Sequence, residues 1–395
     1  MMQAVLLLKQ TLEASYDPGP LLLTGPNVRF TSTDQILSHG AGARQINEVV
    51  VRIGLRPQES AEVIFGRVPG KRLDIRSCTF SLPDEAPMVL TPGMSNEQIL
   101  AFLRTRVSPE KLGFSKDSSF HPRIIRDRCF LQPIVEIHSG SQRISALSFG
   151  GPDRYSKILQ DVIHLPGLRG NPERAYPLTA TGPEFPGTFE RYTASVVAQW
   201  SRSSSERLDQ LGQDLNALGL TWKVEAKELD DTRVELRVGR LRQPRRGGAH
   251  DLVNIADVGF GVSQTLPVLV ALLVAHPGQL VYIEQPEIHL HPRAQVAMAL
   301  LLTRAASRGV RVVVETHSSL LLLGVQSEVA AGNLDEGLVK LHWFTRNDTD
   351  GITSVASAEM DEAGRFGDWP EDFDDVALEA QAHYLDTAES LVARK

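Results

Sequence analysis

Two short apolar runs and the segment between them predict a parallel βαβ unit. The runs Leu280–Ile283 and Val310–Val314 have the length of buried strands and are bounded by glycine, proline or polar residues. Residues 292–307 between them have the length and composition of a helix. A strand, a helix and a second strand in this order favour a right-handed crossover, so both strands should end at the same edge of one sheet.

A different pattern, the alternation of apolar and polar residues, occupies the first half of the chain. It predicts an antiparallel β lobe whose strands lie within residues 47–75, 129–137 and 143–149, with a helix over 94–112. Further segments are predicted as helices or strands by the same reasoning. The helices are 1–14, 208–218, 375–393 and one from about Thr188, and the strand pairs are 21–23 with 28–30, 221–226 with 233–241, and 338–345 with 352–354.

The glycine-rich sequence DVGFGVSQ, residues 257–264, precedes an apolar helix. Gly259 and Gly261 permit backbone angles closed to other residues, Ser263 is a favoured helix N-cap, and Pro267 suits a first turn. A helix that begins in this way offers N–H groups to a phosphate. Taken alone, these residues favour the alternative of an ordinary glycine-rich turn.

Acidic and polar side chains follow both predicted strands. Glu284 ends the first strand, and Glu315, Thr316 and His317 follow the second. Ligands of open α/β sheets bind at this edge, and a carboxylate there is a common Mg²⁺ partner, directly or through water. We therefore expect Glu284 and His317 to lie at one polar site, with Ser263 beside it or across from it. His289 and His291 have a spacing seen in metal sites, but no third ligand is near them in the sequence.

Composition narrows the class of protein. The chain has 395 residues, 42% of them hydrophobic, and a net charge of −7. This is typical of a globular protein of two or three cores and argues against nonspecific nucleic-acid binding over the whole surface. Its two cysteines lie far apart, its apolar runs are too short for a bilayer, and its start lacks the pattern of a secretory signal, so we expect a cytoplasmic protein without a membrane partner.

Charge is nevertheless uneven along the chain. A basic cluster before Gly247 could contact phosphates or be a solvated hairpin end, and the C-terminal part is acidic. The basic residues are Arg233, Arg237, Arg240, Arg242, Arg245 and Arg246, and the acidic ones are Glu359, Asp361, Glu362, Asp368, Glu371, Asp372, Asp374 and Asp375.

The glycine-rich sequence, the strand that ends in Glu284 and the strand followed by His317 form three motifs. In this order they resemble the C-terminal half of an ABC-type ATPase head, as found in SMC, recombination and OLD-like proteins. The resemblance makes DVGFGVSQ the signature motif, with Gly259, Gly261, Ser263 and Gln264 binding nucleotide. It makes Glu284 the end of Walker B, residues 287–292 the D-loop and His317 the switch histidine. It implies ATP and Mg²⁺ as cofactors, with Glu284 holding Mg²⁺ through water.

The resemblance extends over nearly the whole chain and implies a mixed sheet with helices on both faces, an antiparallel β arm lobe and a helical insertion. The element LPGLRGNPERAYP, residues 165–177, and a tryptophan–proline motif, Gly367–Asp375, are similar to sequences of bacterial AAA/OLD-like ATPases. Arg169 and Arg174 could contact a phosphate or a facing copy, or anchor their loop through carboxylates. The expected division is 1–39 and 251–345 for the ATPase core, 40–150 for the arm, 151–250 for the insertion and 346–395 for a small C-terminal domain.

Two departures from the pattern matter. Gln285 stands where most ABC heads have the glutamate that polarises water, so Glu287, Glu315 or His317 would have to replace it for fast hydrolysis. No G-x-x-x-x-G-K-[ST] sequence occurs in the chain. Gly66–Arg72 is one residue short and reads as a hairpin turn. Residues 1–14 are similar to the helix that follows a P-loop, which leaves two alternatives: a start at an internal methionine, or a lost P-loop.

The sequence therefore favours an ABC-type ATPase head that binds ATP between two copies and hydrolyses it slowly. The alternative is a non-hydrolysing scaffold or regulator, and a nuclease has little support because no Toprim-like acidic cluster follows the switch motif. We expect a homodimer or larger homo-oligomer with DNA or an effector protein as partner, in DNA transactions or phage defence. The chain from Met1 should bind MgATP weakly or not at all. With a P-loop upstream it should dimerise on ATP, and Ser263→Arg should block that dimer without unfolding the monomer.

Overall fold

The computed structural model describes residues 2–37, 47–68, 73–104, 118–139, 142–148, 151–203, 205–241, 251–349, 351–367, 382–387 and 389. The chain forms two compact units. Unit 1 contains residues 1–164 and 182–188, and unit 2 contains residues 165–181 and 189–395. The crossing segment 182–188 therefore belongs to unit 1, although the residues on both sides of it belong to unit 2.

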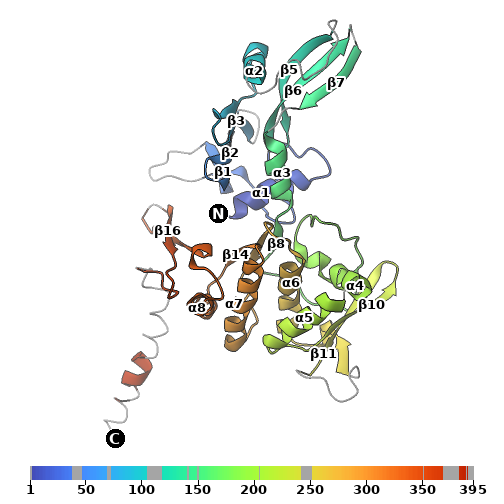
Figure 1. The fold of residues 1–395 in the computed structure, drawn as a ribbon, viewed down its shortest axis with the longest axis vertical. Helices are drawn as coiled ribbons and strands as arrows, with labels where there is room; N and C mark the ends of the chain where they lie inside the picture. Colours follow the sequence, from blue (N-terminus) through green and yellow to red (C-terminus); the bar gives the residue numbers. More distant parts are fainter. Residues whose placement is uncertain are drawn as a thin grey trace. The chain divides into compact units, whose positions relative to one another are not determined.

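Unit 1 is built on two antiparallel sheets and α1 (Figure 1). Alternating burial along β2 and β3 turns one face of the first sheet towards a core that also receives Leu8 and Leu12 of α1. Cys78 and Cys129 lie in that core as free thiols, and burial raises the pKa of the Cys78 thiol to about 12. The elements are α1 (Met2–Glu13), β1 (Glu48–Arg56), β2 (Glu59–Gly66), β3 (Asp74–Ser81), β4 (Met88–Leu90), α2 (Asn96–Arg104), β5 (Ser118–Asp127), β6 (Phe130–Ser139), β7 (Gln142–Ser148) and α3 (Pro152–Gln160). Strand β8 (Ile163–Leu165) begins in unit 1, and its last residue belongs to unit 2.

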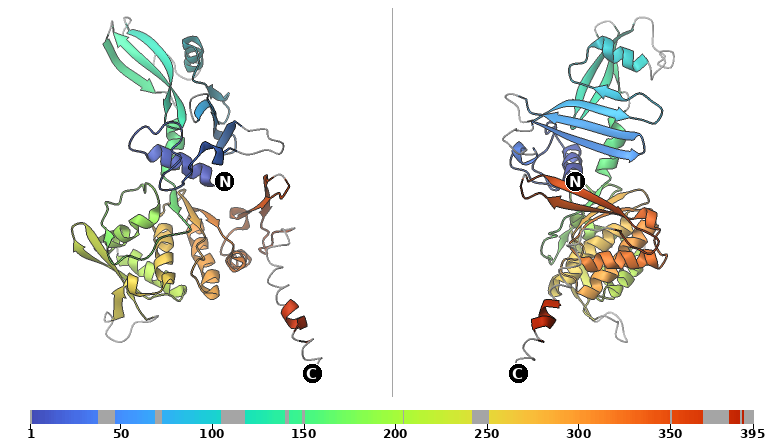
Figure 2. Two further views of the ribbon diagram at one scale, coloured as in Figure 1. Left: turned by 180° about the vertical axis from the view of Figure 1, so that it is seen from behind. Right: turned by 90° about the vertical axis from the view of Figure 1, so that its left-hand side faces the viewer.

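Unit 2 combines a parallel strand pair with helices and a separate antiparallel sheet. Helices α5, α6 and α7 lie side by side in Figure 1, and the apolar α6 has almost all its residues after Gly261 buried. Strands β15 and β16 form a two-stranded antiparallel sheet (Figure 2). The elements are β9 (Tyr176–Pro177), α4 (Thr193–Ser203), α5 (Ser205–Ala217), β10 (Val224–Asp230), β11 (Arg233–Gly239), β12 (Leu252–Asn254), α6 (Phe260–Val274), β13 (Leu280–Glu284), α7 (Pro292–Ser307), β14 (Arg311–Glu315), α8 (Ser319–Ala330), β15 (Lys340–Arg346) and β16 (Thr353–Glu359).

The α/β class expected from the patterns is confirmed, and most predicted elements form. Strand β5 was not predicted, because its sequence SSFHPRIIRD contains a proline and little alternation. The helix expected from Thr188 begins as a 3-10 turn at Phe189–Tyr192 and becomes α-helical only at Thr193. The tryptophan–proline motif after Gly367 and most of the predicted helix 375–393 lie outside the described residues.

No helix in the described ranges has the length and apolar character that a membrane span requires.

Candidate functional site

Strands β13 and β14 place two glutamates side by side. The strands are parallel, and their register pairs Glu284 with Glu315. Helix α7 connects them, as predicted. Because parallel strands end at one edge, Glu284 and the residues after Glu315, including His317, leave the sheet at the same end. This edge is the place where the sequence predicted polar chemistry.

Hydrogen bonds fix the carboxylates at this edge. The Tyr282 hydroxyl donates to Glu315 Oε2 at 2.8 Å, and the backbone N–H of Gly167 donates to Glu284 Oε2 at 2.9 Å. Burial, followed by the hydrogen bond to Glu315, raises the pKa of Tyr282, so its hydroxyl remains a donor over the physiological range. The phenol and the Gly167 amide therefore orient two carboxylates that are only partly buried or exposed.

The turn after β13 is held in an uncommon backbone conformation. Gln285 has φ 45° and His289 has φ 66°, both in the left-handed region that side chains with a Cβ disfavour. The Gln285 N–H donates to the Glu315 carbonyl at 2.7 Å, which ties the turn to β14. Strained residues of this kind persist only where surrounding contacts hold them.

Glu287 connects this turn with the segment after β14. Its Oε1 accepts the backbone N–H of His317 at 3.0 Å. Its Oε2 is buried and has no hydrogen-bond partner within the described part of the chain. The His317 ring is exposed, while the next residue, Ser318, caps α8. Glu287 thus holds the His317 main chain at the site through one carboxylate oxygen, and its other oxygen accepts no hydrogen bond from the described residues.

The start of α6 differs from the prediction in two ways. The helix begins at Phe260 with Gly259 as its N-cap, so Ser263 is not the cap and Pro267 is the eighth helical residue. Ser263 is 9% exposed, and its Oγ donates to the Phe260 carbonyl at 3.1 Å. The premise that Ser263 is a surface helix cap is therefore wrong. Burying an arginine charge at this position would be costly, which argues against the prediction that Ser263→Arg leaves folding intact.

The glycines of this motif are also explained differently. Gly259 has φ −65° and ψ 155°, which any residue adopts, and neither it nor Gly261 has a positive φ. A Cβ at Gly261 would lie 3.2 Å from Leu220 Cδ2 and 3.4 Å from the His289 carbonyl oxygen. Close packing against the turn is therefore the reason for Gly261, rather than backbone freedom.

Phe260 and His289 form an aromatic pair beside this contact. Their rings stack with centroids 5.5 Å apart, and Phe260 remains 48% exposed. No local pattern in the sequence predicts this pair. His289 is thus used in stacking, and His291 accepts the Arg293 N–H as the N-cap of α7.

The loop after β8 joins α6 to the end of β13 through Arg169. Its guanidinium donates to the carbonyls of Gln264 at 3.3 Å, Glu284 at 2.6 Å and Gln285 at 3.3 Å. Gln264 Nε2 in turn donates to the Gly170 carbonyl at 2.6 Å. Burial lowers the pKa of Arg169 to about 10, against the opposing fields of Glu190, Glu287 and Glu284, so the side chain stays charged at neutral pH.

Arg174 has a different environment on the same segment. It is an exposed residue that forms a bidentate pair with Asp257, at 2.7 and 3.3 Å. Of the two roles that the sequence left open, anchoring describes both arginines in this structure. Arg169 anchors through main-chain carbonyls, and Arg174 anchors through a carboxylate.

The donors at this edge suit one kind of metal site. In the described ranges no group of three or more His, Cys, Asp or Glu side chains could hold a metal ion. Mg²⁺ does not need such a group, because it keeps several waters and binds proteins through one or two carboxylates together with substrate phosphates. Glu284, a half-buried carboxylate at the end of β13, fits this water-mediated type.

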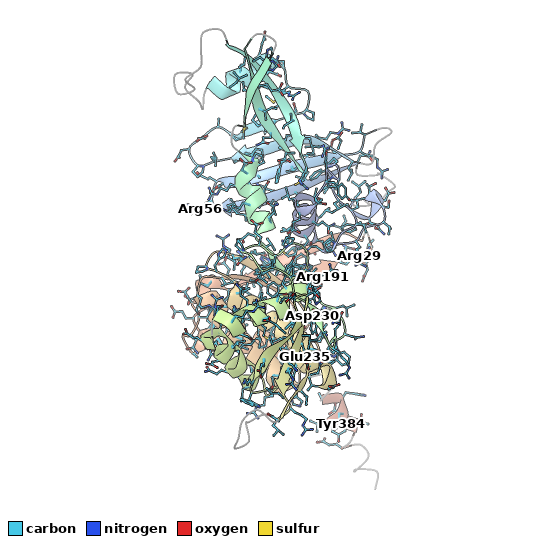
Figure 3. All side chains as sticks on the ribbon, turned by 90° about the vertical axis from the view of Figure 1, so that its right-hand side faces the viewer. Arg29, Arg56, Arg191, Asp230, Glu235 and Tyr384 are labelled. Atoms are coloured by element: carbon cyan, nitrogen blue, oxygen red, sulfur yellow. The ribbon has the colours of Figure 1, made fainter. Side chains whose placement is uncertain are left out.

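The basic cluster is only partly described. Asp230 and Glu235, labelled in Figure 3, pair with Arg233 at 2.7 Å and Arg237 at 3.6 Å, so these two arginines belong to a paired strand surface. Arg242, Arg245 and Arg246 lie outside the described residues.

A hollow of about 990 Å³ lies elsewhere in unit 2, along α5, α6 and α7. Arg304, Ser307 and Arg308 line it at the C-terminal end of α7, whereas the turn that carries Glu287 leads into the N-terminal end of that helix. None of the predicted site residues lines the hollow. We therefore place the candidate site at the strand edge, where carboxylates, strain and the predicted motifs coincide.

Comparison with protein families identifies the class of this segment. Residues 190–323 match the family described as "AAA domain, putative AbiEii toxin, Type IV TA system". The match covers less than half of the chain, and it includes α6, β13, the turn and His317. Residues 190–323, in unit 2, are thus similar to an AAA domain, in agreement with the ATPase class expected from the motifs. No curated protein matches the chain.

Solved structures of SMC heads are similar to the chain at low identity. One is an SMC head bound to the C-winged helix domain of ScpA, with 10% identity, 86% of this chain and 84% of that chain covered, and a TM-score of 0.40. Another is the SMC head domain from Thermotoga maritima, with 9% identity, coverage of 62% and 75%, and a TM-score of 0.28. A third is the Smc head with an extended coiled coil bound to the C-terminal domain of ScpA from Pyrococcus furiosus, with 7% identity, coverage of 90% and 86%, and a TM-score of 0.34.

Proposed function

We propose that this protein is an ABC-type ATPase head that binds Mg²⁺ and ATP at an interface between two copies. The carrying observation is the pairing of Glu284 with Glu315 on parallel strands, with the main chain of His317 bound to Glu287 at the same edge. The AAA-domain match over residues 190–323 supports this proposal.

Each part of the edge has a defined task in this proposal. Glu284, oriented by the Gly167 amide, would hold Mg²⁺ through water, and Glu287 or His317 would position the attacking water. The N–H groups of Phe260 and Gly261, in the first turn of α6, precede the first acceptors of the helix and would face the nucleotide of a second copy. Bound Mg²⁺ would supply neutralisation of phosphate charge.

Gln285 determines the rate of ATP hydrolysis that we expect. Its amide can orient a water but cannot accept the proton, and losing a general base costs on the order of 10²–10⁴ in rate. Hydrolysis should therefore be slow, and the nucleotide should control assembly or conformation more than turnover. The alternative, a scaffold that does not hydrolyse ATP, is favoured by Gln285 and by the absence of a G-x-x-x-x-G-K-[ST] sequence, whereas Glu287 and His317 favour the ATPase.

The biological setting is proposed on narrower grounds. The matched family includes toxins of a toxin–antitoxin system by its description, which suits a defence role with an effector protein as partner. DNA is the other proposed partner, and the cytoplasm is the proposed location.

The test uses the protein expressed from its natural gene and measures phosphate release with and without Mg²⁺. We expect slow, Mg²⁺-dependent hydrolysis that Glu284→Gln lowers at least about 100-fold, since the neutral amide cannot support the metal as the carboxylate does. Glu359→Gln, at an 81% exposed side chain, is the matched control and should keep full activity.

Two results would decide against the proposal. ATP binding without hydrolysis, measured by calorimetry, would favour the scaffold. Hydrolysis that survives Glu284→Gln would remove this edge as the site.

A further inference from the structure

We propose that Arg169 is a positioning residue that locks the strained Glu284–Gln285 peptide to the first turns of α6. This inference rests on the proposed function for its effect on catalysis, but the lock itself is a property of unit 2. The Arg169 side chain lies between two motifs that are distant in sequence. Its hydrogen bonds reach both α6 and the end of β13.

The carbonyls that Arg169 holds are those of the strained peptide. Glu284 O receives the short 2.6 Å bond and Gln285 O a longer one, so the guanidinium binds the main chain on both sides of the Gln285 φ of 45°. The Gln285 N–H is held from the opposite side by Glu315. A left-handed non-glycine residue costs about 1–3 kcal/mol, and these three bonds supply the restraint that keeps it in place.

A reciprocal contact makes the connection rigid. Arg169 donates to the Gln264 carbonyl, and the Gln264 side chain donates back to the carbonyl of Gly170. Gly170 has φ 72°, a conformation that glycine adopts without strain, and it turns that carbonyl towards α6. On the other side of Arg169, the Gly167 amide binds the Glu284 carboxylate. The loop therefore fixes the backbone and the side chain of the β13 end together.

Burial distinguishes Arg169 from an arginine that reaches a partner. It is 8% exposed, and both of its terminal nitrogens are engaged within unit 2. Arg174, five residues later, is 73% exposed at its side chain and pairs with Asp257. A guanidinium holds its carbonyl partners in fixed directions through its planar fork, whereas a lysine ammonium is a point charge on a flexible stem. We therefore expect the two arginines to behave differently on substitution.

The experiment compares Arg169→Met and Arg169→Lys with Arg174→Met, each in the natural background and with Gln285→Gly. The primary readout is amide hydrogen exchange at Gln285 and His317, relative to Ile283 in the same strand. We expect Arg169→Met to speed exchange at Gln285 at least about 10-fold, because its peptide loses two restraints on a strained conformation. Glycine at 285 adopts the conformation without strain, so in that background the increase should fall below about 3-fold. Arg174→Met should leave both amides unchanged.

If Arg169→Met does not fold, Arg169→Lys and Gln264→Met weaken the same lock less severely and carry the same expectation in direction. An equal increase in exchange over all of unit 2, unaffected by Gln285→Gly, would overturn the proposal and make Arg169 an ordinary anchor. So would an unchanged Gln285 amide.

Catalysis provides the second readout. In protein that hydrolyses ATP, Arg169→Lys should lower kcat at least about 10-fold and change KM less than about 3-fold, since positioning affects the transition state more than binding. Absence of ATPase activity in the unsubstituted protein would count against the proposed function alone, because the exchange measurement still decides whether Arg169 locks the peptide.

Discussion

The polar cluster on α1 in unit 1 and the strand edge in unit 2 use charged residues in opposite ways. On α1, Lys9 is fully buried, and its three N–H donors meet Glu13, the Gln160 carbonyl and the Phe185 carbonyl. Gln10 likewise makes four hydrogen bonds with the turn at residues 22–28. At the strand edge, by contrast, Glu287 has an unpartnered oxygen and Gln285 and His289 are strained.

The difference separates structure from function. Buried charge costs several kcal/mol unless it is paired and fully hydrogen-bonded, so the α1 cluster is stable only because each of these groups finds a partner inside unit 1. Glu13 also accepts the Gly187 amide, which fixes the crossing segment 182–188. The strand edge keeps unused hydrogen-bonding capacity and stored strain, which are properties of sites that bind a ligand.

The largest expected change in stability concerns the polar cluster on α1. Lys9→Met leaves the Glu13 carboxylate buried without its cation, and we expect the free energy of unfolding to fall by about 3–5 kcal/mol. Lys9→Met combined with Glu13→Leu should recover most of that loss, because no isolated charge remains. Urea unfolding followed by circular dichroism measures both. Lys340→Met, in an exposed pair with Glu359, is the control and should change stability by less than about 1 kcal/mol. A similar loss in the single and double variants would show that the pair does not act as a unit.

At the strand edge, replacing a charged residue should affect ATP hydrolysis more than stability. Glu287→Gln retains an oxygen that can accept the His317 N–H and removes a charge whose second oxygen has no partner. We expect stability to stay within about 1 kcal/mol of the original protein while ATP hydrolysis falls. Denaturant unfolding and phosphate release are measured on the same preparation. A stability loss as large as that of Lys9→Met would make Glu287 a structural residue and erase the contrast.

The smallest effect concerns an exposed ion pair in unit 1. Two hydrogen bonds from Arg126, with help from the Gly19 amide, lower the pKa of Asp17 to about 2. Because the folded pKa lies below the unfolded one, near 3.8, the stabilisation is fully present above about pH 4 and is lost as pH falls towards 2. Solvent screens this surface pair, so Asp17→Asn should cost less than about 1 kcal/mol at pH 7 and a smaller amount near pH 2, where the carboxylate is half protonated. Unfolding measured at both pH values checks this; an equal cost at both would exclude the charge as its source.

The strand edge was predictable because its signal is local. Burial makes β13 and β14 continuous apolar runs, and parallel pairing requires that Glu284 and His317 leave at the same end. The start of α6 was not predictable from residue preferences, since Ser263 is a good cap in isolation but is buried in the helix by the packing of α6. Gly261 was noticed for the wrong reason, because the close approach of His289 is a tertiary contact.

What the sequence determined by itself was therefore the class of fold, the order of the motifs and the carboxylates at the strand edge, because these follow from periodicity and chain direction. Only the tertiary structure decided which polar side chains are engaged in hydrogen bonds inside the protein and which keep a free hydrogen-bonding atom. Arg169 shows this most clearly: the sequence allowed it to reach a phosphate or to anchor its loop, and only the packed loop reveals its guanidinium buried on three carbonyls. Hydrogen bonds between residues roughly a hundred positions apart depend on how helices, strands and loops pack within unit 2, and no local sequence pattern encodes that packing.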